Sequence, residues 1–324
     1  MKLARLLPTT VALATLLALA PAWASGDEHG KALAETAEAG EHGEEHGEDE
    51  PYANVMMHHI TNGYDMELPW FNSHLGHKVD LRETFGTWTF EFGETTIDMT
   101  PSKLVIFLWI SGLLLYLIYG VFAPKRYDER GVPKGINNLL EVLVIFVRDE
   151  IAIANIGKKE GPRYVPFLCT LFLFILVMNF VGLIPYGATA TSNLAVTGAL
   201  ALVAFFMTTL AGMRAHGTFG YWKALVPSGV PAALWPLMWP IEFVGLFTKP
   251  FALTVRLFAN MTAGHVVILS LLGLIFVQKS LVWVPVSVPF ALFIYLLEIL
   301  VALLQAYIFA MLTALFIGLA SHDH

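Results

Sequence analysis

The chain has 324 residues, of which 56% are hydrophobic and 14% are charged. Soluble domains contain roughly 45–50% apolar residues, so this composition excludes an ordinary soluble protein and indicates a membrane protein. One cysteine, Cys169, excludes an intrachain disulfide, a thiolate metal cluster and a CxxC redox site. The net charge of −7 is concentrated in residues 26–50, which hold ten acidic residues and one lysine, so the remaining chain is close to neutral.

The N-terminal region has the features of an exported protein. Lys2 and Arg5 precede an apolar stretch and an Ala-Trp-Ala cleavage site at 22–24, which predicts a signal peptide over residues 1–25. An uncleaved membrane anchor is the alternative, although the apolar stretch is short for a span of ~20 residues. Residues 26–51 are acidic, contain histidine and lack aromatic residues, which predicts a disordered periplasmic tail rather than a loose metal site.

The rest of the chain predicts an all-α membrane protein. Residues 52–102 form a periplasmic or membrane-surface segment in which the alternation of WTFEF suits a strand or a surface-bound stretch. Residues 136–156 mix apolar and charged residues and predict an amphipathic helix on the membrane surface. Within a membrane domain at 103–320, apolar stretches predict about five membrane helices, at 103–123, 165–186, 193–213, about 241–277 and about 281–319.

The distribution of basic residues predicts the orientation. Eight Lys and Arg residues lie in the connection 124–163, whereas the GATATS connection at 187–192 has no charge. The positive-inside rule then places the first connection in the cytoplasm and the second outside. The sequence therefore predicts a multi-pass protein of a bacterial inner membrane, with a periplasmic N-terminus and a cytoplasmic C-terminus.

The last two apolar stretches are each nearly 40 residues long, about twice what crosses a ~30 Å hydrocarbon core. They must be either strongly tilted or broken. No charged loop divides either stretch, which favours two long, steeply tilted helices joined at residues 278–280.

Seven polar residues interrupt this hairpin: Glu242, Lys249, Arg256, Asn260 and His265 in its first helix, and Glu298 and Gln305 in its second. A charged residue at the centre of a membrane helix costs about 2.5–3.5 kcal/mol on insertion scales, so such residues commonly serve a function. At 100° per residue, the first four fall within about 80° of one another and form one polar stripe.

His265 lies outside this stripe. It points about 180° away from Arg256 and lies roughly 13 Å further along the helix axis. Glu298 and Gln305, seven residues apart, share a face of the second helix, so an imidazole and a carboxylate can meet near the outer side. The alternative for each group is a structural role, in which it pairs with a neighbour to fix the helix register. The structural role is favoured for Lys249, which can extend to the membrane interface, whereas the structural and functional roles are weighted equally for Glu242 and Asn260.

Three motifs carry a resemblance to a known family. KPFALTVRLFANMTAGHVV (249–267) resembles the arginine-containing helix of the F-type ATP synthase subunit a family, ALLQAYIFAMLTALFIGLA (302–320) resembles its final helix, and VMNFVGLIPYG (177–187) resembles an earlier element. The similarity covers about residues 100–320 in the same order. It implies a proton-carrying stator subunit of the membrane Fo sector, which is not an enzyme by itself and binds no cofactor, metal or nucleic acid.

The resemblance also implies roles and partners. Arg256 is the expected essential arginine facing the rotor ring of c subunits, flanked by Asn260 and Gln305. Glu242 is expected to line the cytoplasmic half-channel, and His265 with Glu298 the outer half-channel. The expected partners are the c-ring, the peripheral-stalk b subunits, the F1 sector and the lipid bilayer.

The chain departs from the family pattern at the outer half-channel. His265 stands where well-known bacterial members have Glu, and Glu298 where they have His, so the pair is exchanged. Gly182 and Asn193 replace acidic residues of some members. A secondary transporter is disfavoured because no repeat is found, and a membrane enzyme because HExxH and GxSxG motifs are absent. The stator of another ion-driven motor is the nearer alternative.

Overall fold

The computed structural model describes residues 65–68, 77–86, 89–92, 95–98, 100–122, 136–184, 189–224, 234–278 and 280–321. The predicted signal peptide at 1–25 and the tail at 26–51 lie outside these residues. Ahead of the membrane helices are a short helix, α5 (Leu81–Phe85), and four short strands, β1 (Asp65–Leu68), β2 (His77–Asp80), β3 (Thr89–Phe92) and β4 (Thr95–Asp98). They form two antiparallel pairs, with Asp65 opposite Asp80 and Thr89 opposite Asp98. Residues 89–92 of the WTFEF stretch therefore form a strand, β3.

Among the described residues, five helices are long and apolar enough to cross a membrane, which confirms the predicted fold class. They are α6 (Lys103–Tyr116) with its extension η2 (Leu117–Phe122), α9 (Gly161–Leu183), α10 (Leu194–His216), α12 (Trp235–Val277) and α13 (Val284–Ser321). Shorter helical segments lie between them: α7 (Ile136–Phe146), η4 (Val147–Ile153), α8 (Ala154–Ile156), η5 (Ala190–Ser192), α11 (Thr218–Ala224) and η7 (Leu281–Trp283).

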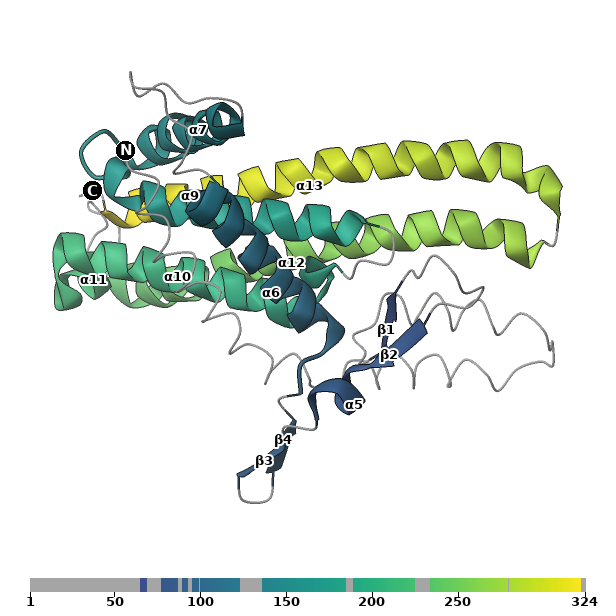
Figure 1. Ribbon diagram of the computed structural model, residues 1–324. Helices are drawn as coiled ribbons and strands as arrows, with labels where there is room; N and C mark the ends of the chain where they lie inside the picture. The colour runs from purple at the N-terminus through teal and green to yellow at the C-terminus, as the bar shows by residue number, and fades with distance from the viewer. Residues whose placement is uncertain are drawn as a thin grey trace.

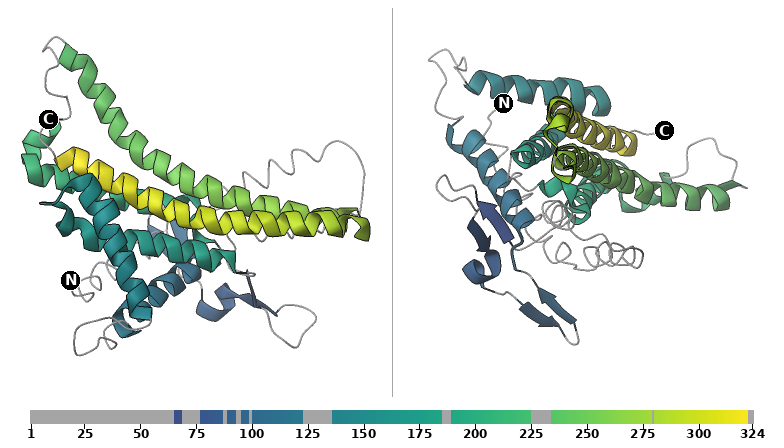
Figure 2. Two further views of the ribbon diagram at one scale, coloured as in Figure 1. Left: turned by 90° about the horizontal axis from the view of Figure 1, so that it is seen from above. Right: turned by 90° about the vertical axis from the view of Figure 1, so that its right-hand side faces the viewer.

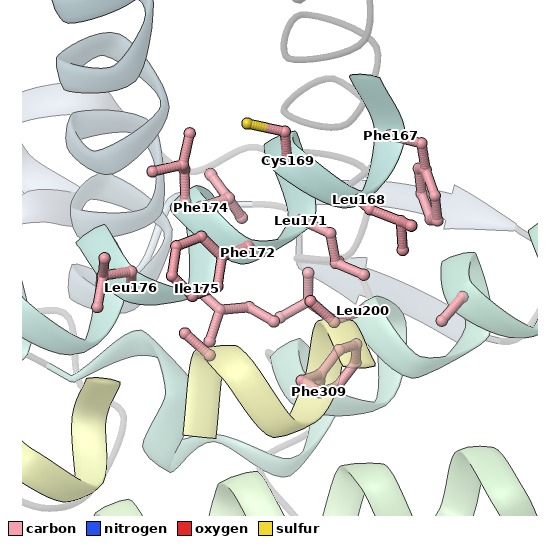
Figure 3. Close-up of a cluster of buried hydrophobic side chains, with 14 of the residues drawn as sticks. Phe167, Leu168, Cys169, Leu171, Phe172, Phe174, Ile175, Leu176, Leu200 and Phe309 are labelled. Carbon is pink, nitrogen blue, oxygen red and sulfur yellow. The ribbon is translucent and has the colours of Figure 1, made fainter. Parts of the chain in front are cut away.

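The helix α9 is the centre of the packed bundle. Pro162 lies in its first turn, where a missing backbone N–H costs no helical hydrogen bond. Its residues are apolar on every side, the pattern of a helix surrounded by protein. Figure 3 shows Leu168, Leu171 and Phe172 of α9 among buried side chains that include Leu200 of α10 and Phe309 of α13.

The ends of α10 follow the usual capping chemistry. The side chain of Asn193 accepts hydrogen bonds from the backbone N–H groups of Ala195 (2.8 Å) and Val196 (3.4 Å), so it caps the N-terminus. Gly217 follows the last helical residue with φ of +77°, a conformation that favours glycine. Asn193 therefore serves as a helix cap.

The helices α12 and α13 form the predicted long hairpin, and neither is broken. They contain 43 and 38 residues and would measure ~64 and ~57 Å if straight. Pro240, Pro250 and Pro289 lie inside them without ending the helix. Figures 1 and 2 show the two helices side by side at their joined end, beyond the reach of α9 and α10, with α12 diverging from α13 toward its own N-terminus.

Candidate functional site

The hairpin brings the imidazole of His265 and the carboxylate of Glu298 together. His265 Nδ1 on α12 lies 2.5 Å from Glu298 Oε1 on α13. Glu298 is 4% exposed, and the His265 side chain is 24% exposed. At this distance one proton can be held by either partner, which makes the pair a carboxylic acid beside an imidazole or a carboxylate beside an imidazolium.

A glycine makes room for this contact. A Cβ atom placed on Gly264 would lie 2.8 Å from Glu298 Oε1 and 3.0 Å from its Cδ. The first is shorter than the roughly 3.3–3.6 Å of a close carbon–oxygen contact, and the second is shorter than the roughly 3.5–4.0 Å of a carbon–carbon contact. Any side chain at 264 would therefore displace the Glu298 carboxylate from its position against His265.

The other nitrogen of the His265 ring contacts Thr189, in the connection between α9 and α10. The Nε2 atom lies within hydrogen-bond distance of Thr189 Oγ1. The same hydroxyl donates to the carbonyl oxygen of Gly182 at 3.3 Å. A Cβ atom on Gly182 would lie 2.8 Å from Thr189 Cα, so the absence of a side chain at 182 lets Thr189 approach. In this chain Thr189 occupies space that an acidic side chain at 182 would need.

A second set of buried polar groups lies between α9, η5 and α13. Thr191 donates from its hydroxyl to Asn179 Oδ1 at 2.8 Å, and Asn179 Nδ2 donates to the carbonyl oxygen of Ala302 at 3.2 Å. Tyr295 of α13 donates from its hydroxyl to the carbonyl oxygen of Leu183 at 3.0 Å. These bonds tie the end of α9 to α13 beside the His265–Glu298 pair.

Arg256 and Asn260 lie on the opposite side of α12. Both are exposed, whereas Leu253, one turn before Arg256, and Leu257, which directly follows it, are buried against the bundle. Within the described part of the chain, no residue forms an ion pair or a hydrogen bond with the Arg256 side chain. The guanidinium therefore faces away from the protein core, on a helix whose exposed side is largely apolar.

The remaining predicted residues are less exposed than Arg256 and Asn260. Gln305 is buried at 6% exposure on α13, and Glu242 is half-buried near the N-terminal end of α12. Lys249 is half-buried, with its Nζ atom 5.3 Å from the centre of the Phe316 ring on α13, a cation–π contact. The structure thus brings His265 and Glu298 together and leaves Arg256 separate from that pair.

Sequence reasoning missed Thr189, Thr191 and Tyr295. Two signals pointed to them. The connection at 187–192 has no charge, yet two of its six residues are threonines. Tyr295 is a polar aromatic residue within an apolar stretch, and it lies three residues before Glu298. Neither signal identifies a contact, because each pairing depends on tertiary packing against the end of α9.

The site and the fold together define a class: a multi-pass membrane protein with a buried imidazole–carboxylate pair and an outward-facing arginine. The family described as ATP synthase A chain matches residues 105–318. The chain therefore belongs to this family. Membership places it in the membrane-embedded Fo sector of ATP synthase, a complex of several subunits, and so in ion transport and ATP synthesis.

Individual relatives extend the match beyond the membrane helices. The chain is 49% identical to ATP synthase subunit a of Anaeromyxobacter sp. (strain Fw109-5), over 94% of this chain and 81% of the relative. It is 55% identical to ATP synthase subunit a of Myxococcus xanthus, over 70% of this chain and 76% of the relative. It is 46% identical to ATP synthase subunit a of Chloroherpeton thalassium, over 98% of this chain and 92% of the relative.

Proposed function

We propose that this chain is the non-catalytic stator subunit that carries protons between two half-channels and couples their passage to rotation of a ring of c subunits. The observation that carries the proposal is Arg256, a cation without an internal partner among the described residues, on an exposed apolar helix face. Such a charge is costly beside lipid, so it calls for an external anion. A carboxylate on a passing rotor subunit has the required charge.

The outer half-channel contains the Glu298–His265 pair, and the cytoplasmic half-channel contains Glu242. A proton from outside reaches the pair and then a rotor carboxylate, which becomes neutral and can face lipid. Because a guanidinium stays charged in proteins, Arg256 cannot relay the proton, but it attracts the ionised carboxylate and favours release of its proton. Each proton delivers about 2.3 kcal/mol per 100 mV of membrane potential.

The proposal includes an orientation and a set of partners. The mature N-terminus lies in the periplasm after removal of residues 1–25, and the C-terminus lies in the cytoplasm of a bacterium, with the chain in the inner membrane. Asn260 and Gln305 lie near the contact with the c-ring. Peripheral-stalk b subunits hold the chain still, and the F1 sector carries out the nucleotide chemistry.

The test is Arg256→Ala in the complete ATP synthase in membrane vesicles. We expect loss of proton-driven ATP synthesis with the complex still assembled, because the barrier between the half-channels is removed. Arg163→Ala is the matched control, since Arg163 is an exposed arginine 4.0 Å from Glu160 and outside the hairpin. Normal synthesis by the Arg256→Ala complex would refute the assignment.

A further inference from the structure

The hydroxyl of Thr189 has one proton and two neighbours that could accept it. These are the carbonyl oxygen of Gly182 and Nε2 of His265. Gly182 lies in the last turn of α9, where carbonyl oxygens have no partner along the helix. It is also buried, so leaving its carbonyl without a hydrogen bond would cost roughly 1–3 kcal/mol.

The buried carbonyl of Gly182 favours one direction for both hydrogen bonds of the Thr189 hydroxyl. If Thr189 turned its proton toward His265, the buried carbonyl of Gly182 would lose the bond that Thr189 provides. If Thr189 donates to Gly182, its oxygen is free to accept a proton from His265 Nε2–H, so the hydroxyl, the carbonyl and Nε2 each have a partner. The second arrangement is therefore favoured, and it keeps a proton on Nε2 whether the ring is neutral or charged.

We infer that His265 exchanges its proton through Nδ1 alone, with Glu298, and that Thr189 is the positioning residue that imposes this tautomer. The inference rests on the proposed function for its role in proton transport. In the exchange, the O–H bond of protonated Glu298 breaks and an N–H bond forms at Nδ1. Carboxylic acid and imidazole become carboxylate and imidazolium, with no change in total charge.

The committed Nε2 atom decides which group passes the proton onward. A histidine that conducts through its ring takes up a proton at one nitrogen and releases it from the other. Here Nε2 is committed to Thr189, so His265 is a side branch that exchanges with Glu298, and Glu298 passes the proton onward. Among the described residues, Glu298 is the charged side chain in contact with the ring, from α13, and Thr189 faces it from the connection before η5.

The tautomer can be measured directly by solid-state NMR of the complete ATP synthase in lipid vesicles, with ¹⁵N in the histidine rings. His265→Gln provides the difference spectrum that identifies the His265 signals. We expect Nε2 to be protonated at every pH at which the complex is active. A signal from unprotonated Nε2 in the unaltered complex would overturn the inference.

Two substitutions test the role of Thr189. Thr189→Val keeps the shape but removes the acceptor, so a population with unprotonated Nε2 is expected, whereas Thr189→Ser should keep the original spectrum. A Thr189→Val spectrum identical to the unaltered one, or a Ser variant that behaves like Val, would refute the role. These spectra do not depend on rotation, so they remain informative even if Arg256→Ala fails to stop synthesis.

Proton conduction tests the side branch. Glu298→Gln should abolish passive conduction through Fo, whereas His265→Gln, which retains an amide donor for Thr189, should leave a reduced but measurable rate, lower by about tenfold. Equal abolition by the two substitutions would mean that the proton passes through the ring, contrary to the inference.

Discussion

The substitution Gly264→Ala should disturb the contact between His265 and Glu298 without lowering the stability of the fold. The added Cβ would lie 2.8 Å from Glu298 Oε1, so the carboxylate must move by about 0.5 Å or more to restore a normal contact. The obstructed atom is the end of a flexible side chain, so the helices themselves need not move. The cost falls on the 2.5 Å contact with His265 Nδ1. A charge-assisted contact contributes about 1.5–3 kcal/mol, and a tenfold change corresponds to about 1.36 kcal/mol, so proton conduction should fall by about 10- to 160-fold.

The assay is passive proton uptake into vesicles from which the nucleotide-binding sector has been removed, followed by a pH-sensitive dye. Gly198→Ala is the matched control, because a Cβ at 198 would meet Thr254 Cγ2 at an ordinary 3.8 Å. Both variants should assemble in normal amounts, and alanine should suit either helix. If Gly264→Ala conducts as fast as Gly198→Ala, the contact is not part of the proton path.

Three further substitutions test the packing of the helical bundle. Asn193→Ala removes the cap of α10 and should destabilise the chain by about 1 kcal/mol, seen as a lower melting temperature of the purified complex; an unchanged melting temperature would contradict the capping role. Gly318→Ala should reduce the amount of assembled complex, because its Cβ would lie 3.2 Å from the carbonyl carbon of Asn155 and closer still to the oxygen; normal assembly would show that α8 can shift. Asn179→Leu leaves the buried hydroxyl of Thr191 without its acceptor and should cost about 1–3 kcal/mol in thermal stability, whereas an equally stable variant would show that Thr191 finds another partner.

The membrane helices were predictable because length and apolar composition determine them. The continuity of α12 and α13 was predictable for a different reason, because no charged loop interrupts either stretch. The prolines inside them do not end the helices, because a break would expose unpaired backbone N–H and C=O groups to lipid. The helix period also placed His265 on the side opposite Arg256. The exposure of Arg256 and the contact of His265 with Glu298 agree with that geometry.

The surroundings of the pair were not predictable. Thr189 reaches His265 where it packs directly against Gly182, and such a close approach of backbone is not described by any periodicity. The pairing of β3 with β4 was open for a related reason, since alternation suits a strand and a membrane-surface segment equally.

The length of α12 affects where the membrane potential acts. If its 41-residue apolar part is to remain within a ~30 Å core, its axis must incline by about 60° from the membrane normal. Arg256 and His265, ~13 Å apart along that axis, then differ in depth by only about 7 Å but are separated by about 12 Å within the plane of the membrane. Most of that separation runs across the electric field rather than along it. A charge moving from one position to the other would therefore cross only about a quarter of the potential, and the rest must be crossed within the half-channels on either side.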